Sequence, residues 1–499
     1  MGVSVLDDGG FRPGPRVIFV VLALASLVAA GFADREAASR AARQPVTLVL
    51  LALGVLGAVS AAWTVGSVGN AVRWGLVTIG YGAILVSGWV VSRRRFGRAG
   101  IATLVVLVGF ISAVIGLCGA TAFAEPFADH TSGFWRPGGT LEYSAALSLL
   151  EVAALPILLT AMAHRNRLLA AGAAFLAAVA AVVLALGHSR LECAFATLVC
   201  AAAVTLPRRT VHASRATATS AVAVLALAAV GAYLIAGARV AVSAHHHQAA
   251  RLGGIAVVCL AAGVVWAIGR APSLRRPARL GAIAAVLAIA AAVVAITAVA
   301  GDTSHYFNTQ YGGFFHGRLS LWGTALSTAR HDFVLGHGAD SFLPATEFTQ
   351  TGGAIRFAHD LPLELAVELG IVGFALALAL YASTLTAIWR SRRRPDAWLF
   401  GVAALTFPLA NLLDWEWHLA GSGAVWALAL GALIARPAPA SSNVVASGPP
   451  HEQSRQARIA AAKRSSAPGA RSRYRLGSIA SSSISTGSPE GPGTRSTRE

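Results

Sequence analysis

Long apolar runs separated by short polar connections make up this chain as far as residue 435. A helix needs about 20 apolar residues to cross a bilayer, and most of these runs reach or approach that length. We predict about thirteen spans, at 17–33, 46–66, 72–91, 100–123, 141–162, 168–187, 191–207, 217–238, 252–269, 280–300, 363–389, 398–413 and 420–435. The predicted fold class is all-α, a polytopic transmembrane helix bundle.

Arginine clusters indicate the orientation of these spans. They fall in every second connection, at Arg93–Arg95 and Arg98, Arg165 and Arg167, Arg208–Arg209, Arg275–Arg279 and Arg392–Arg394. Lysine and arginine accumulate in cytoplasmic loops, so these connections should lie inside the cell. The alternate connections, which should face outward, are 124–140, 188–190, 241–251, 301–361 and 414–418.

The N-terminal segment 1–16 precedes an apolar run that resembles a signal peptide. Strict alternation, however, places Arg35, Arg40 and Arg43 inside, and this favours a first span that is retained. The rest of the chain then divides into a transmembrane bundle of about ten spans (17–300), a large extracytoplasmic loop (301–361) and C-terminal helices (362–435). We predict that 436–499, rich in Ser, Pro, Gly and Arg, is a disordered basic cytoplasmic tail.

Composition supports a membrane protein rather than a nucleic-acid-binding one. Hydrophobic residues make up 56% of 499 positions and charged residues 12%, and the mean hydropathy is +0.64. A soluble protein carries about a quarter charged residues. The net charge of +18 lies mostly in short connections and in the tail, where the positive-inside bias accounts for it.

The loop 301–361 is the longest hydrophilic stretch between apolar runs, and arginines gather in it and in other outward connections. They are Arg136, Arg190, Arg318, Arg330 and Arg356. Because arginine is unusual on the outer side, we interpret the set as a site for phosphate or diphosphate, which guanidinium groups bind through paired hydrogen bonds. The alternative is that each arginine reaches to lipid headgroups.

His359 is the main candidate for acid–base chemistry. It precedes a helix whose start is indicated by Asp360 at the cap position and Pro362 in the first turn. A helix N-terminus attracts anions, and a histidine there could take a proton from an attacking hydroxyl group. The alternative is a surface histidine beside an aspartate that only caps the helix.

Three further polar residues extend the candidate site. His337 lies in Gly336-His337-Gly338, which suits either an anion-binding turn or a plain turn. Glu364 and Glu368 share one helical face just inside the membrane, where carboxylates line polar cavities or pair with arginine. We find no metal-binding, nucleotide-binding or serine-hydrolase motif, so we predict neither cofactor nor metal ion.

These residues resemble the O-antigen ligase family, which includes O-antigen polymerases and protein O-oligosaccharyltransferases. The resemblance covers about residues 130–430 and rests on six blocks, at Arg136–Leu141, Gly187–Arg190, Gly317–Trp322, Gly336–Gly338, Ala358–Asp360 and Glu368–Gly373. Departures from the family pattern at Ala145, Leu191 and Asp360 concern the acceptor and the subfamily.

The resemblance implies a metal-independent glycosyltransferase of the GT-C type. Such an enzyme moves a glycan from undecaprenyl diphosphate to an acceptor hydroxyl of a lipid, protein or glycan on the periplasmic or exterior face of the inner membrane. It implies that Arg190 and Arg318 hold the diphosphate and that His359 orients or deprotonates the acceptor. Arg136, Arg356, His337, Glu368 and Asp360 are the predicted substrate-binding residues. Two alternatives stay open: a polymerase of lipid-linked repeat units, and a transporter or flippase of lipid-linked sugars.

Overall fold

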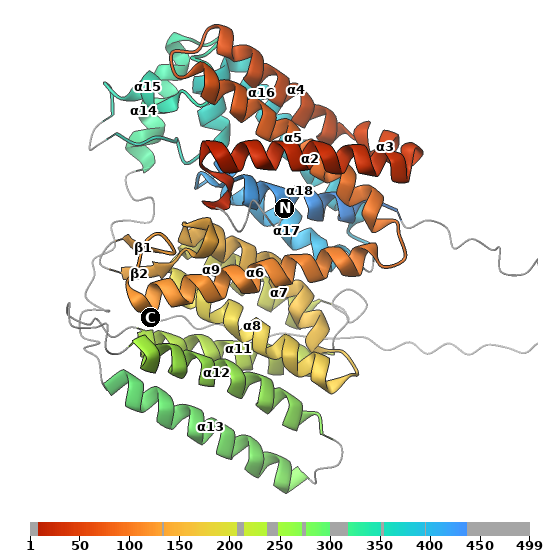
Figure 1. The fold of residues 1–499 in the computed structure, drawn as a ribbon, viewed down its shortest axis with the longest axis vertical. Helices are drawn as coiled ribbons and strands as arrows, with labels where there is room; N and C mark the ends of the chain where they lie inside the picture. Colours follow the sequence, from red (N-terminus) through yellow and green to blue (C-terminus); the bar gives the residue numbers. More distant parts are fainter. Residues whose placement is uncertain are drawn as a thin grey trace, which may run out of the picture. The chain divides into compact units, whose positions relative to one another are not determined.

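The computed structural model describes residues 8–131, 134–206, 214–236, 248–271, 276–299, 318–350, 354–394 and 396–436. The predicted tail beyond residue 436, and residues 301–317 of the predicted large loop, lie outside these ranges. Helices form almost all of the described part, which confirms the all-α prediction (Figure 1). One short antiparallel hairpin, β1 (Ala128–Thr131) with β2 (Phe134–Pro137), pairs Asp129 with Arg136.

Among the described residues, nine helices are long and apolar enough to cross a membrane. They are α2 (Pro13–Ala33), α4 extended by η2 (Pro45–Ala62), α5 (Val68–Ser92), α6 (Gly97–Ala122), α7 (Ser144–Met162), α8 (Arg167–Gly187), α12 (Gln248–Gly269), α13 (Arg276–Val299) and α16 (Leu361–Ser391). Shorter apolar helices lie in α11 (Arg215–Ala236), α17 (Ala397–Ala410) and α18 (Ala420–Ile434). The polytopic membrane architecture is therefore confirmed.

Helix α9 (Arg190–Thr205) differs from the span predicted at 191–207. It has 16 residues and carries Arg190 and Glu192 in its first turn, and it is not one of these apolar helices. The two charged side chains shorten its apolar part below the thickness of a bilayer core. The structure also adds α3 (Arg35–Ala42), which Asp34 caps by accepting a hydrogen bond from the backbone N–H of Ala37.

Small residues bring the helices of the core close together. The fully buried Tyr81 of α5 packs between Phe19 of α2 and Trp426 of α18. Gly431 of α18 lies against α5 so closely that a Cβ atom there would meet the carbonyl oxygen of Leu85 at 2.2 Å. Close backbone approach of this kind stabilises helix pairs in lipid, where hydrophobic burial alone does not.

The two ends of the bundle differ in character. At one end, arginines of the turns bind helix C-termini: Arg94 donates to the carbonyl oxygen of Ala33, and Arg98 to that of Ala435. The other end gathers the start of α2, the β hairpin, the start of α7, η5 (Glu416–His418), α14 (Arg318–His331) and α15 (Phe342–Thr346). This separation agrees with the alternation predicted from arginine, while the side of the membrane that each end faces stays a prediction.

Helix α16 is interrupted at Gly370, and backbone groups beside this interruption bind the segment 333–342. Gly370 has φ +61° and ψ −154°, and a Cβ atom there would lie 2.3 Å from the carbonyl oxygen of Val334. The interrupted turn frees backbone groups that bind the incoming loop: Ile371 N–H donates to Phe333 O (2.7 Å), and Gly338 N–H to Glu368 O (2.7 Å). Only glycine tolerates this conformation and approach.

Candidate active site

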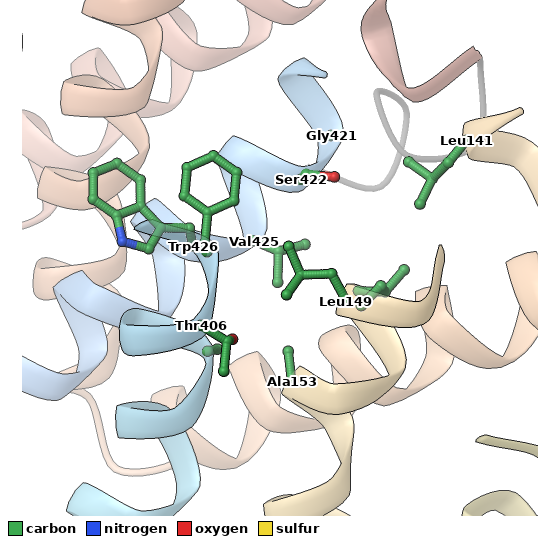
Figure 2. A pocket seen from close by; sticks show the side chains of 11 residues that line it. Leu141, Leu149, Ala153, Thr406, Gly421, Ser422, Val425 and Trp426 are labelled. Atoms are coloured by element: carbon green, nitrogen blue, oxygen red, sulfur yellow. The ribbon is translucent and has the colours of Figure 1, made fainter. Parts of the chain in front are cut away.

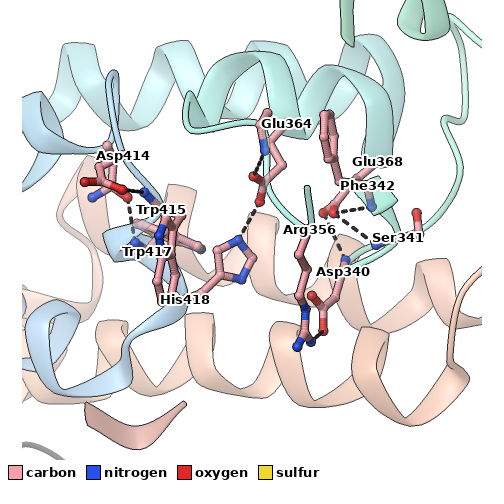
Figure 3. A network of polar contacts seen from close by, with 12 residues as sticks. Asp340, Ser341, Phe342, Arg356, Glu364, Glu368, Asp414, Trp415, Trp417 and His418 are labelled. Atoms are coloured by element: carbon pink, nitrogen blue, oxygen red, sulfur yellow. Dashed lines mark hydrogen bonds and ion pairs between the residues drawn. The ribbon is translucent and has the colours of Figure 1, made fainter. Parts of the chain in front are cut away.

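A cluster of polar side chains lies at the end of the bundle that contains the β hairpin. The carboxylate of Asp414 is at its centre. Asp414 lies between α17 and η5 and is 7% exposed. Its oxygens accept hydrogen bonds from the Tyr143 hydroxyl (2.8 Å to each oxygen) and from the Trp415 backbone N–H (2.9 Å). Figure 3 shows Asp414 and Trp415 on the segment that leads into η5.

His359 binds this carboxylate. Its Nδ1 lies 3.2 Å from Asp414 Oδ1, and the residue adopts a left-handed φ of +54°, which is uncommon for a non-glycine residue. Such strain persists only where surrounding contacts impose it, and it is concentrated at functional sites. With Nδ1 on the carboxylate, the other ring nitrogen, Nε2, is available to exchange a proton.

Arg318 completes the group. Its Nη2 lies 4.0 Å from Asp414 Oδ2, so the structure brings Arg318 and His359 together on one carboxylate. Burial alone would raise the pKa of Asp414. The His359 hydrogen bond and charge, the Arg318 charge and the Trp415 N–H outweigh burial and lower it. Asp414 is therefore ionised beside two cationic or proton-bearing groups.

Helix α14 packs on the bundle through one side only. Its side chains Leu319 and Leu326 are exposed. The buried side chains are Leu321, Ala325 and Ala329, and the Trp322 indole donates to the carbonyl oxygen of Ala358 (3.1 Å). This bond ties the first turn of α14 to the residue before His359.

Glu416, two residues after Asp414 and the first residue of η5, provides a second carboxyl group. Glu416 is completely buried and lies beside the hydroxyl group of Ser422. Burial, Asp414 and Glu192 together raise the pKa of Glu416 well above its usual value, which disfavours a second negative charge beside Asp414. The cluster therefore holds its negative charge on Asp414.

Arg136 and Arg190 lie on elements next to this cluster. Arg136 of β2 makes a bidentate pair with Asp129 of β1 (2.9 and 3.1 Å). Burial and the Arg136 charge lower the pKa of His188, at the end of α8, to about 4. Arg190 opens α9 and is exposed, two residues before Glu192, which interacts electrostatically with Asp414, Arg318 and Arg136. The predicted role of Arg190 on a diphosphate stays a prediction.

The backbone that follows Gly336-His337-Gly338 binds a carboxyl group of the same chain, that of Glu368. The Glu368 carboxylate is completely buried and accepts backbone N–H bonds from Asp340, Ser341 and Phe342 (2.9–3.0 Å). His337 Nδ1 lies 2.9 Å from the carbonyl oxygen of Val367. Figure 3 shows the Glu368 side chain facing Ser341 and Phe342. This geometry favours structural roles for His337 and Glu368, and their predicted contact with substrate gains no support from it.

Asp360 and Glu364 also have partners within the protein. Asp360 caps α16 by accepting the N–H of Leu363 (2.9 Å), and burial raises its pKa to about 6. Glu364 accepts the N–H of Ala358 (2.9 Å) and binds Nε2 of the buried His418, rather than an arginine. Both carboxylates fix the backbone on either side of His359.

The N-terminal segment covers the same end of the bundle. Arg16 of α2 is 4% exposed, donates to the carbonyl oxygen of His418 (3.2 Å) and lies 3.8 Å from Asp340 Oδ2. Arg356 reaches the same Asp340 oxygen at 3.5 Å. Sequence reasoning missed Asp414, Tyr143, Glu416 and Arg16. An aspartate in an outward connection was the one available signal for Asp414.

The two described cavities have mainly apolar linings. One, between α7, α17 and α18, is lined by side chains such as Leu149, Phe407 and Val425 and has Ser422 at its rim (Figure 2). Another lies between α11, α12 and α13 and has only apolar lining residues. Neither contains a predicted site residue, and the hydroxyl groups of Thr406 and Ser422 are the polar side chains that line the first.

Comparison with known proteins supports the family resemblance. Residues 246–378 match the family model described as O-Antigen ligase. The matched segment includes Arg318, His337, Arg356, His359 and Glu368, while Arg136, Arg190 and Asp414 lie outside it. No curated protein matches the chain.

Proposed function

We propose, on the premise that the chain is a membrane glycosyltransferase of the O-antigen ligase or polymerase type, that it transfers a glycan from a polyprenyl diphosphate to an acceptor hydroxyl. The observation that carries this proposal is the convergence of Arg318, His359 and Asp414 from three separate elements of the fold. We further propose that the site faces the outside of the plasma membrane, as the arginine distribution predicts.

His359 is the general base in this scheme. Asp414 holds Nδ1–H and fixes the tautomer, so Nε2 can accept the proton of the acceptor hydroxyl. The hydroxyl oxygen then forms a bond to the anomeric carbon of the glycan as the bond from that carbon to the diphosphate oxygen breaks. The ionised Asp414 stabilises the imidazolium that results.

Arg318 and Arg190 stabilise the leaving diphosphate, whose negative charge increases as the bond breaks. Preplaced cations lower the barrier because they gain interaction energy only as that charge develops. Arg136 adds positive charge at the same end of the bundle, although its guanidinium is already paired with Asp129. The proposed chemistry uses only side chains of this protein and requires no metal ion.

Polymerase activity differs from ligase activity in the acceptor alone. The same site would join two lipid-linked repeat units if the acceptor hydroxyl belonged to a second glycan on a lipid carrier. A transporter is less favoured, because transporters place ionisable groups and broken helices around a mid-membrane site. Here the polar groups that meet on Asp414 lie at one end of the helices, and the backbone groups at the break in α16 bind Phe333 and Gly338 of the same chain.

The test is transfer from a polyprenyl-diphosphate glycan by the purified full-length chain. His359→Ala should reduce transfer by about 10²–10⁴-fold, the usual contribution of a general base. Arg190→Ala and Arg318→Ala should weaken donor binding. Transfer at the wild-type rate by His359→Ala would remove His359 from the mechanism, and normal donor affinity in both arginine variants would remove the diphosphate clamp.

A further inference from the structure

Four aromatic rings form a continuous wall beside the Asp414–His359 pair; we call Phe11, Phe357, Trp415 and Tyr143 the aromatic wall. Trp415 stacks on Phe357 with centroids 5.2 Å apart and planes 18° apart, and lies 4.6 Å from Tyr143. Phe11 meets Trp415 edge-on at 5.5 Å. Phe357 is buried, whereas Phe11, Trp415 and Tyr143 each keep part of their surface exposed.

The wall is attached directly to the candidate catalytic group. Trp415 donates its backbone N–H to Asp414, and the Tyr143 hydroxyl donates to the same carboxylate. Phe357 precedes His359 by two residues. A molecule lying against these rings would therefore be adjacent to the histidine that takes the proton.

Two guanidinium groups extend the wall on the side of Phe11. The Arg16 and Arg356 guanidinium carbons lie 5.3 and 5.2 Å from the Phe11 ring centroid. Asp340 is the one carboxylate within ion-pair distance of either arginine in the described part of the chain, at 3.8 and 3.5 Å. Two positive charges share one negative charge, so one positive charge is left uncompensated.

Neither arginine is saturated by these contacts. Arg16 is 4% exposed, and its Nε has no hydrogen-bond partner among the described residues. The Arg356 side chain is 45% exposed, and Figure 3 shows it lying alongside Asp340 near His418. A partly exposed arginine held over aromatic rings is preorganised to bind an anion, because little side-chain entropy remains to be lost.

We propose that the aromatic wall together with Arg356 and Arg16 is a binding site for a pyranose that carries an anionic group, either a carboxylate or a phosphate. The sugar ring packs its C–H face on the exposed parts of Trp415 and Phe11, while the anionic group pairs with the exposed guanidinium of Arg356 and the buried Arg16 adds positive charge beside it. This assignment rests on the proposed function in one respect: the bound sugar is taken to be the acceptor.

We assign the sugar bound at the aromatic wall to the acceptor and not to the donor, because Arg318 is the proposed partner of the donor's diphosphate. Asp414 joins the two parts of the site: Arg318 pairs with its carboxylate, and Trp415, the next residue, belongs to the wall. A sugar on the wall and a diphosphate at Arg318 would thus meet at His359. The acceptor class is therefore an acidic or phosphorylated saccharide.

Binding is tested on the purified full-length chain by saturation-transfer NMR with three probes: a hexuronate, a hexose 6-phosphate and the neutral hexose. The wild type should bind both charged sugars more tightly than the neutral one. Arg356→Ala should remove this preference, lowering charged-sugar affinity about tenfold. Trp415→Leu, or Trp415→Phe if the leucine variant does not fold, should weaken binding of all three sugars.

Arg392→Ala is the matched control, since Arg392 also lies over an indole ring, that of Trp389 at 3.6 Å, but at the opposite end of the bundle. It should bind all three probes as the wild type does. Equal affinity for charged and neutral sugars in the wild type, or competition by inorganic phosphate as strong as that of hexose 6-phosphate, would overturn the proposal.

His359→Ala separates this proposal from the proposed function, because it should bind the charged sugars normally while failing to transfer. If the wild type shows the charge preference but transfers no glycan, the saccharide site stands and its assignment to an acceptor fails. If transfer occurs but Arg356→Ala changes donor affinity rather than the acceptor KM, the site belongs to the donor and the proposal is contradicted.

Discussion

His359 Nδ1 lies 3.2 Å from Asp414 Oδ1, although 55 positions separate the two residues in the chain. One residue precedes α16 and the other follows α17, so the antiparallel packing of these two helices brings them together. The pair defines the direction of proton transfer, because the carboxylate occupies one ring nitrogen and leaves the other for substrate.

Asp414→Asn tests this orientation without changing side-chain size. The side-chain amide of the introduced asparagine can donate a hydrogen bond to His359 Nδ1. This favours the imidazole tautomer that carries its proton on Nε2, and in that tautomer Nε2 cannot accept a proton from the acceptor hydroxyl. We expect the transfer rate to fall by about a hundredfold or more, with donor affinity changed little. A rate within twofold of wild type would show that His359 does not depend on Asp414.

Arg318→Ala tests the charge at the leaving group. Loss of a charge-assisted contact costs about 1.5–3 kcal/mol, so donor affinity or rate should fall about tenfold to a hundredfold. Arg330→Ala is the control: Arg330 is exposed in the last turn of the same helix. If both variants lose the same activity, the effect comes from general charge near the membrane and not from Arg318.

Glu368→Gln separates a structural role from substrate contact. The carboxylate accepts three backbone N–H groups, and an amide offers only one oxygen to them while placing NH₂ against a donor. We expect a loss of stability of about 1–3 kcal/mol, seen as a lower melting temperature in detergent. Unchanged melting with weaker substrate binding would restore the interpretation of Glu368 as a substrate ligand.

We expect Asp360→Asn to stabilise the folded protein relative to the wild type, by an amount that depends on pH. Burial raises the Asp360 pKa from 3.8 to about 6, so the folded protein binds this proton more tightly than the unfolded chain does. The contribution of Asp360 to stability is therefore full below about pH 4 and is lost as pH rises through about 6. Asparagine keeps the helix cap and has no charge to bury.

The melting temperature of Asp360→Asn relative to wild type should consequently rise between pH 4 and pH 8, by an amount equivalent to at most about 2.5 kcal/mol. Asp360→Ala serves as the control, because it also lacks the charge but loses the cap, at a cost of about 1 kcal/mol at every pH. A difference between Asp360→Asn and wild type that does not change with pH would contradict the buried, charge-disfavouring position of this side chain.

The spans could be predicted from sequence because apolar length alone specifies them. Helix α9 shows the limit of that rule: within the span predicted at 191–207 the structure has a 16-residue helix with Arg190 and Glu192 in its first turn, and this helix is not among the apolar ones. The meeting of Arg318 and His359 was also predictable, because both lie in the same polar segment and carry chemistry suited to a diphosphate and a hydroxyl group.

Asp414 and Arg16 could not be found in this way, because their partners are distant in sequence. Arg16 donates to His418, 402 positions away, and from sequence it reads as an ordinary basic residue flanking a first span. Glu368 was found from sequence, but its role differs from the predicted one. Its residue type indicated a polar cavity, but the break at Gly370 turns the loop backbone toward it and leaves it no exposed surface.

The most direct test of the account is a double-mutant cycle on His359 and Asp414, read as the initial rate of polyprenyl diphosphate release during glycan transfer. If the two residues act as one unit, the double variant of His359→Ala and Asp414→Asn should be about as slow as His359→Ala alone. Additive losses from the two substitutions, with the double variant slower by the product of both effects, would contradict the Asp414–His359 pair as the base.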